Sequence, residues 1–197
     1  MVQRTIVLTG IGGQGIQLAA KTLATAALTD GRQVQLFSSY GGMMRGGNSD
    51  AYLVISDGPV VAPPVPGSAW AAIVMHHEHA AGVWEKLGPD SITVINDSVV
   101  DPTCRPSERR GRVVEVDAVA IATESGAAQA ASLAAIGAFV GATSIVSETA
   151  LLGSSAQVLP SYRSEAASAN RQVLAAGLEA SEVLAEAWLA ESAMGQS

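Results

Sequence analysis

Cysteine is nearly absent from this chain: Cys104 is the only one in 197 residues. A single thiol cannot form a disulfide within the chain, and it cannot supply the ligands of an iron–sulfur cluster or a structural zinc site. Positive charge is also scarce, with 11 lysines and arginines against 18 aspartates and glutamates and a net charge of −7. That balance disfavours broad electrostatic attraction to nucleic acid, so we expect no nucleic-acid partner.

Long hydrophobic runs are missing as well. Stretches such as residues 73–75 and 134–141 are too short or too rich in alanine to cross a bilayer, so we expect no membrane association. The chain begins directly with a strand pattern and shows no signal-peptide layout, which predicts a cytoplasmic protein. Hydrophobic residues nevertheless make up 48% of the chain and charged residues only 15%. This surplus of apolar surface predicts an oligomer or a heteromer.

Short apolar runs alternate with segments of helical periodicity, and this pattern predicts an α/β fold. We expect one domain over residues 1–197, built as a three-layer Rossmann-like arrangement of a mixed, mostly parallel sheet flanked by helices. The link between residues 37 and 51 is too short for a crossover helix, so the third strand is predicted to run antiparallel. The expected strands are 5–9, 33–37, 51–56, 71–75, 91–95 and 112–116, and the expected helices are 14–28, about 79–87, a region from 119, 127–140 and a C-terminal helix at about 163–190.

The turn Gly10-Ile11-Gly12-Gly13-Gln14-Gly15 follows the first strand and opens the first helix. Glycines allow a tight turn and close approach to the backbone, and free N–H groups at a helix N-terminus favour an anion. A dinucleotide site also needs an acid at the end of the second strand, where this chain has Ser38-Ser39-Tyr40, and Asp30 precedes that strand. Three interpretations therefore stay open: a dinucleotide site, close helix–strand packing without a ligand, and contact with another subunit or an anionic group.

A second glycine loop runs from Tyr40 to Gly47 and carries one cation, Arg45. It lies beyond the C-terminal end of a strand, where α/β sheets place ligands. Its guanidinium is a planar, permanently charged fork that suits phosphate or carboxylate, and the alternative is an arginine that anchors its own loop. The candidate cofactor-binding or interface residues of the two loops are Gly10, Gly12, Gly13, Gln14, Gly15, Tyr40, Arg45, Gly46 and Gly47.

These two loops in this order resemble one family: the gamma subunits or gamma domains of the 2-oxoacid:ferredoxin oxidoreductases, which act on pyruvate, 2-oxoglutarate, 2-oxoisovalerate or indolepyruvate. The likeness continues through Ser132–Gly137 and through Asn170 with Ala176-Gly177. The family often has Pro-Glu where this chain has Gly42-Met43, so no role of that acid carries over.

The resemblance implies a non-catalytic subunit that is inactive in isolation. Thiamine diphosphate with magnesium would be held by alpha and beta subunits, iron–sulfur clusters by a cluster-bearing subunit, and coenzyme A would accept the acyl group. We expect the glycine loops, with Arg45, to support assembly and to position the acyl acceptor or the facing chain. A free-standing nucleotide-binding oxidoreductase that uses the turn Gly10–Gly15 is the alternative.

All three histidines fall in Met75-His76-His77-Glu78-His79. No two of them are four residues apart, so the helical H-E-x-x-H zinc pattern is absent. We expect a polar loop at the C-terminal edge of the sheet, at a subunit contact, rather than a metal site. The arginine-rich stretch 105–112 is expected to be a solvated loop.

Overall fold

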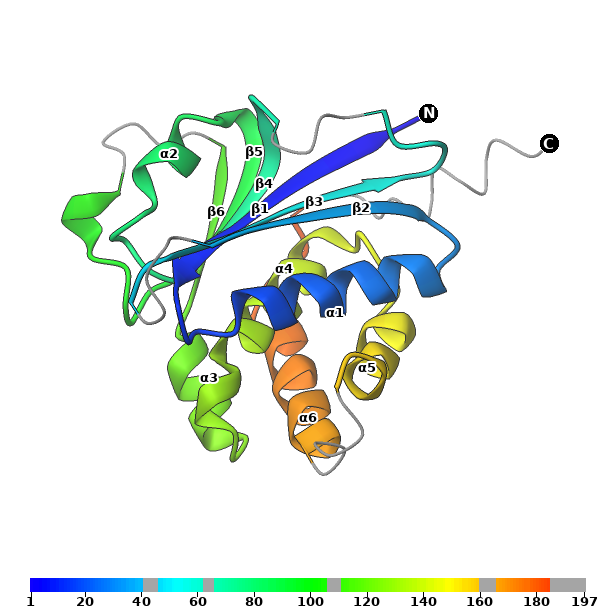
Figure 1. The fold of residues 1–197 in the computed structure, drawn as a ribbon. Helices are drawn as coiled ribbons and strands as arrows, with labels where there is room; N and C mark the ends of the chain where they lie inside the picture. Colours follow the sequence, from blue (N-terminus) through cyan, green and yellow to red (C-terminus); the bar gives the residue numbers. More distant parts are fainter. Residues whose placement is uncertain (41–45, 62–65, 106–110, 160–165, 185–197) are drawn as a thin grey trace.

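The structure is a computed structural model that describes residues 1–40, 46–61, 66–105, 111–159 and 166–184, with the side chain of Tyr40 left out. The described residues form a six-stranded sheet in the order β2-β3-β1-β4-β5-β6 (Figure 1). The strands are β1 (Gln3–Ile11), β2 (Gln33–Tyr40), β3 (Asn48–Ser56), β4 (Ala69–Val74), β5 (Leu87–Asn96) and β6 (Arg112–Val116).

Strand β3 is antiparallel to both of its neighbours, β1 and β2. The pairs β1–β4, β4–β5 and β5–β6 are parallel. Five of the six strands therefore point the same way, which confirms the predicted mixed, mostly parallel sheet and the antiparallel third strand. The physical reason is the one inferred from the sequence: the link from β2 to β3 is too short to return the chain to the other end of the sheet.

Most of the helices cover one face of the sheet (Figure 1). The other face carries α2, residues Ala81–Trp84, whose Val83 packs in a smaller core cluster with Val7 and Val74. None of the helices in the described ranges has the length and hydrophobicity needed to cross a bilayer. The helices of the first face are α1 (Ile16–Thr29), α3 (Ala118–Glu124), α4 (Ala131–Thr143), α5 (Glu148–Gln157) and α6 (Ala166–Glu179).

Helix α4 is the centre of the larger core. It is almost entirely buried and mostly alanine, glycine and large apolar residues, so it has no polar face to present to water. Glycines let α6 approach it closely: a Cβ on Gly137 would lie 2.9 Å from the Cα of Gly177, and one on Gly141 would lie 2.7 Å from the Oγ of Ser181. The α4–α6 contact therefore depends on small residues.

Two predicted helices have the wrong bounds, and a third helix was missed. The helix expected at 79–87 is only the four residues of α2, and helix α5 was not predicted. The helix expected to reach about residue 190 ends at Glu179, and residues 180–184 are not helical, while 163–165 and 185–190 lie outside the described residues. Residues 180–184 turn back onto α4, where the N–H of Leu184 donates to the carbonyl of Ala142.

Candidate functional site

The two glycine loops meet at the C-terminal edge of the sheet. Gly10 and Ile11 are the last residues of β1, and they pair with the first residues of β3. Beyond the strands, the N–H of Gly12 donates to the carbonyl oxygen of Gly47 at 2.8 Å. This bond joins two segments that are 35 positions apart in the sequence (47 − 12). The sequence predicted that both lie at the same edge of the sheet, but it did not predict this contact.

Gln14 fastens the first loop to the sheet. Its Oε1 accepts a hydrogen bond from the N–H of Ile11 at 2.9 Å, and its Nε2 donates to the carbonyl of Met75 at 3.2 Å. A Cβ on Gly10 would lie 2.5 Å from that same Oε1, so a larger residue at position 10 would displace the glutamine. Gln14 and Gly10 therefore have packing roles that require no ligand.

Gly13 and Gly15 are required by the backbone itself. Both have positive φ, 105° and 76°, a region that residues with a Cβ rarely adopt. Gly15 is the N-cap of α1, and with no side chain it leaves the first-turn N–H groups of that helix without a side-chain acceptor. These N–H groups and the positive end of the helix dipole suit an anion.

Part of the second loop lies outside the described residues, namely residues 41–45 and with them Arg45. Gly46 has a φ of 75°, so a glycine is needed there too. Tyr40 ends β2 and pairs with Ser49. Of the second loop, Tyr40, Gly46 and Gly47 are therefore brought to the edge, and the placement of Arg45 remains a prediction.

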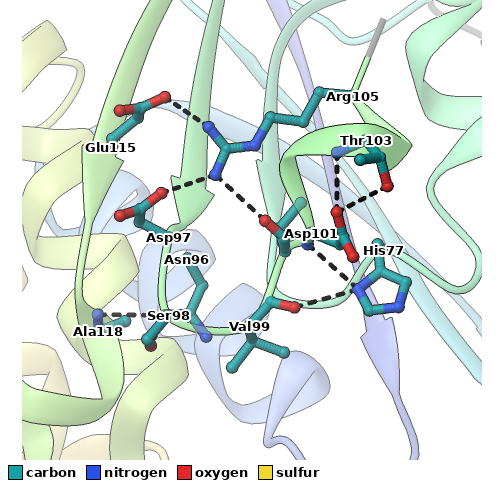
Figure 2. A network of polar contacts seen from close by, with 11 residues as sticks. His77, Asn96, Asp97, Ser98, Val99, Asp101, Thr103, Arg105, Glu115 and Ala118 are labelled. Carbon is teal, nitrogen blue, oxygen red and sulfur yellow. Dashed lines mark hydrogen bonds and ion pairs between the residues drawn. The ribbon is translucent and has the colours of Figure 1, made fainter.

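Two further buried polar groups lie at this edge. The Oγ of Ser132, at 2% exposure, would be 2.9 Å from a Cβ on Gly15, and it has no hydrogen-bond partner in the described structure. Asn96, the last residue of β5, accepts hydrogen bonds at Oδ1 from the Ala118 N–H and the Ser98 hydroxyl (Figure 2). Its buried Nδ2 donates to none of the described residues. Ser132 lies beside the turn and Asn96 at the end of β5; each has an unused polar atom, and sequence reasoning missed both.

An acid at the edge was missed as well. Asp50 pairs with Thr9 on one side and Ser39 on the other, because the antiparallel β3 begins at the edge where β1 and β2 end. Its side chain is buried at 8% exposure, and only its Oδ2 is paired, with the Nδ2 of Asn48. It lies on the face away from α1, with Tyr52, whose pKa is raised by burial and by the charge of Asp50. The antiparallel direction predicted for β3 could have revealed Asp50, because it places the first residues of β3 at the edge where β1 and β2 end.

The histidine cluster lies in the loop after β4. The rings of His76 and His77 are stacked at 4.6 Å, and burial, followed by the neighbouring charge of His77, lowers the pKa of His76. The Nδ1 of His77 is 3.0 Å from the carbonyl of Val99 and 3.3 Å from the N–H of Asp101, so its tautomer decides which bond forms (Figure 2). His77 thus ties the loop after β4 to the loop after β5.

The expectation of a solvated loop over residues 105–112 is wrong at Arg105. Its side chain is only 16% exposed and forms ion pairs with Asp97 at 2.6 Å and Glu115 at 2.5 Å (Figure 2). It also donates to the carbonyl of Val100. Arg105 therefore holds the loop after β5 against β6, while residues 106–110 lie outside the described residues.

The described residues do not bring together a set of metal ligands. Cys104 is exposed and is the only cysteine of the chain. Within the described ranges, no three histidine, cysteine, aspartate or glutamate side chains come together as metal ligands. An iron–sulfur cluster needs several cysteine ligands, so this chain, with one cysteine, cannot hold a cysteine-ligated cluster by itself.

Comparison with known proteins identifies the family. The family model described as pyruvate ferredoxin/flavodoxin oxidoreductase matches residues 5–180. The chain belongs to this family. The 2-oxoglutarate synthase subunit KorC of Methanothermobacter thermautotrophicus is 34% identical over 151 residues, covering 74% of this chain and 79% of that one.

A solved structure of the same family agrees over nearly the whole chain. The gamma subunit of the keto/oxoacid ferredoxin oxidoreductase from Geobacter sulfurreducens superposes with a TM-score of 0.76 at 26% identity, covering 91% of this chain and 96% of that one. The pyruvate synthase subunit PorC of Methanosarcina barkeri is 30% identical over 140 residues, 68% of this chain and 74% of that one. These matches confirm the resemblance to gamma subunits of 2-oxoacid:ferredoxin oxidoreductases that the two glycine loops predicted.

Proposed function

We propose that this chain is the non-catalytic gamma component of a 2-oxoacid:acceptor oxidoreductase that depends on thiamine diphosphate and iron–sulfur clusters. The enzyme would decarboxylate a 2-oxo acid oxidatively, to an acyl-CoA or an acid. Alpha and beta subunits would hold thiamine diphosphate and magnesium, and another subunit would hold the clusters. The observation that carries the proposal is the joining of the two glycine loops, Gly12 to Gly47, in a chain whose residues 5–180 match the family.

The role proposed for the joined loops is to bind the anionic part of the acyl acceptor, coenzyme A, or an acidic group of the facing subunit. The α1 N-terminus supports this because its first N–H groups have no side-chain acceptor. The Oγ of Ser132, which has no partner among the described residues, adds an uncharged polar group beside the turn. Arg45 would supply the positive charge from the second loop, and a guanidinium binds phosphate or carboxylate through two parallel hydrogen bonds.

A free-standing nucleotide-binding oxidoreductase is less well supported. Strand β2 ends without an acid for the ribose hydroxyls. Asp30 is already engaged elsewhere: its carboxylate accepts from the backbone N–H of Ser147 at 2.6 Å and from the Ser147 hydroxyl at 2.7 Å. These bonds hold the N-terminus of α5 and leave Asp30 no role at the glycine turn.

The test is the substitution Arg45→Ala in the complex co-expressed with its partner subunits. We expect a higher apparent KM for coenzyme A, weaker assembly, or both. Arg171→Ala is the matched control, because this arginine is exposed on α6, away from the glycine loops. If assembly and the KM for coenzyme A both match the control, the role proposed for Arg45 is wrong.

A second experiment separates the two functions. The tagged chain, purified from its native host, should bring down a large thiamine-binding chain and a cluster-bearing chain. Calorimetric titration of the isolated chain with NAD should give no binding heat. Clear NAD binding together with the absence of partner chains would replace the subunit proposal by the free-standing enzyme.

A further inference from the structure

The two edges of the sheet differ in how they are protected. Strand β6 is five residues long and carries Arg112 and Glu115. The guanidinium of Arg112 donates to the carbonyl of Leu184, and Glu115 is paired with Arg105. Short length, charge and covering segments are the means by which proteins prevent an edge strand from pairing with another chain.

Strand β2 lies at the opposite edge, and in the part of the chain that the structure describes it has none of these protections (Figure 1). It runs for eight residues, Gln33–Tyr40, with no charged residue and no proline. All of its backbone pairing is with β3, and no other described segment pairs with its outer side. An edge of this kind presents a row of free N–H and C=O groups that another strand can pair with.

The side chains of β2 also leave apolar surface open. Phe37 is 42% exposed, on the sheet face away from α1, where its ring lies 6.4 Å from that of Tyr52. On the other face, Val34 and Leu36 are only partly buried against the larger core. A strand paired with the outer side of β2 would cover Phe37 on one face of the sheet and Val34 and Leu36 on the other.

We propose that β2 pairs antiparallel with β2 of a second copy of this chain, about a twofold axis at Phe37, so that two six-stranded sheets become one. Successive side chains of a strand point to opposite faces of the sheet. A twofold axis perpendicular to the sheet therefore pairs side chains of the same face only when it lies level with a residue and not between two residues. With the axis at Phe37, the two Phe37 rings face each other and Gln35 faces Ser39. With the axis at Leu36, each Phe37 would face a glutamine.

A second copy can meet this edge without bringing like charges into contact. Each chain has a net charge of −7, so an interface of charged residues would add close repulsion between like charges to the repulsion between the whole molecules. Strand β2 is uncharged for its whole length and avoids this added repulsion, and cross-strand aromatic pairs are among the stabilising pairs of antiparallel sheets. The dimer needs only residues of this chain and does not depend on the function proposed above.

Sedimentation velocity of the purified full chain over a range of concentrations tests the dimer. We expect a dimer for the wild type and a dissociation constant raised about tenfold or more by Phe37→Lys, because two ammonium groups would then face each other. Val119→Lys on α3 is the matched control at 39% exposure and should leave the dimer unchanged. Mixing Phe37→Lys with Phe37→Glu should restore dimerisation, since opposite charges then meet at the axis.

Cross-linking gives an independent readout of the register. In a Cys104→Ser background, Phe37→Cys should form a disulfide dimer on mild oxidation, because facing residues of an antiparallel pair have Cα atoms about 4.5–5.5 Å apart. Val119→Cys in the same background should not. A monomeric wild type, a Phe37→Lys variant that still dimerises, or equal cross-linking of the two cysteine variants would overturn the proposal. If the free chain is monomeric and Phe37→Lys instead loses the other subunits on co-purification, the edge binds a different chain.

Discussion

The substitution Gly177→Ala tests how strictly the α4–α6 contact depends on glycine. A Cβ at this position would lie 3.0 Å from the carbonyl carbon and 3.1 Å from the Cα of Ala134, and closer still to its carbonyl oxygen. These neighbours are backbone atoms of α4, so no side chain can rotate away. Two well-packed helices would have to separate to admit one methyl group.

Two effects oppose each other in this variant. Alanine is favoured over glycine inside a helix by about 1 kcal/mol. Overpacking a buried contact costs typically about 1–3 kcal/mol and occasionally more. Because the obstructing atoms of Ala134 are main-chain atoms and lie on the most buried helix, we place the overpacking cost at or above the upper end. The free energy of unfolding should therefore fall by about 2 kcal/mol.

Urea unfolding followed by far-ultraviolet circular dichroism measures this change. With an m-value of about 2 kcal/mol/M, the midpoint should fall by about 1 M. Gly153→Ala in α5 is the matched control, because a Cβ there would meet no atom within 4 Å. It should raise the midpoint by about 0.5 M through helix propensity alone. Equal midpoints for the two variants, or a stabilised Gly177→Ala, would refute the argument from close packing.

Three further substitutions test local interactions by the same unfolding assay. The hydrogen bond from the Ala120 N–H is the largest cause that holds the pKa of Asp117 below its ordinary value, so its stabilisation is complete at neutral pH and is lost as the pH falls below about 4. Asp117→Asn should therefore be destabilised at about pH 7 and should approach the wild type near pH 3; a gap that does not depend on pH would contradict this. Ser147→Ala removes the N-cap of α5 and should cost about 1 kcal/mol. Gln14→Ala leaves the buried Met75 carbonyl without its donor and should cost about 1–2 kcal/mol; no change would show that the turn holds without it.

The sheet was largely predictable from sequence because its signals are local. Buried strands are short apolar runs, and the length of a connection limits the direction of the next strand. Thus β6 has the predicted bounds 112–116, and β3 runs antiparallel as expected. Strand β1 is longer than the apolar pattern alone indicated, because the first two residues of the glycine turn, Gly10 and Ile11, still pair with β3 at Ser49 and Asn48.

Helix α5 was missed because its sequence, with Gly153, Ser154 and Ser155, carries little apolar periodicity. It forms because Ser147 caps it, Asp30 holds that cap from the end of α1, and α1 packs along it. The overlong C-terminal helix is the opposite error. Its helical pattern continues past Glu179, but the hydroxyl of Ser181 donates to the carbonyl of Ala138 and draws the chain back onto α4.

At the candidate site, the glycine residues were found and several of their neighbours were not. The turn was visible because positive-φ positions require glycine in the sequence itself, as at Gly13 and Gly15. Asp50, Asn96 and Ser132 carry no such signal, since a single polar residue in an apolar segment is not distinctive. They become notable only when burial and unsatisfied atoms are seen together.

The sequence by itself determined the α/β class, the two glycine loops and the family, because each of these depends on residues close together in the chain. Only the tertiary structure decided which atoms meet: Gly12 with Gly47, Gln14 with Met75, and Asp30 with Ser147. These contacts join segments separated by 35, 61 and 117 positions. Their partners depend on how whole strands and helices pack, and no local pattern of residues records that packing.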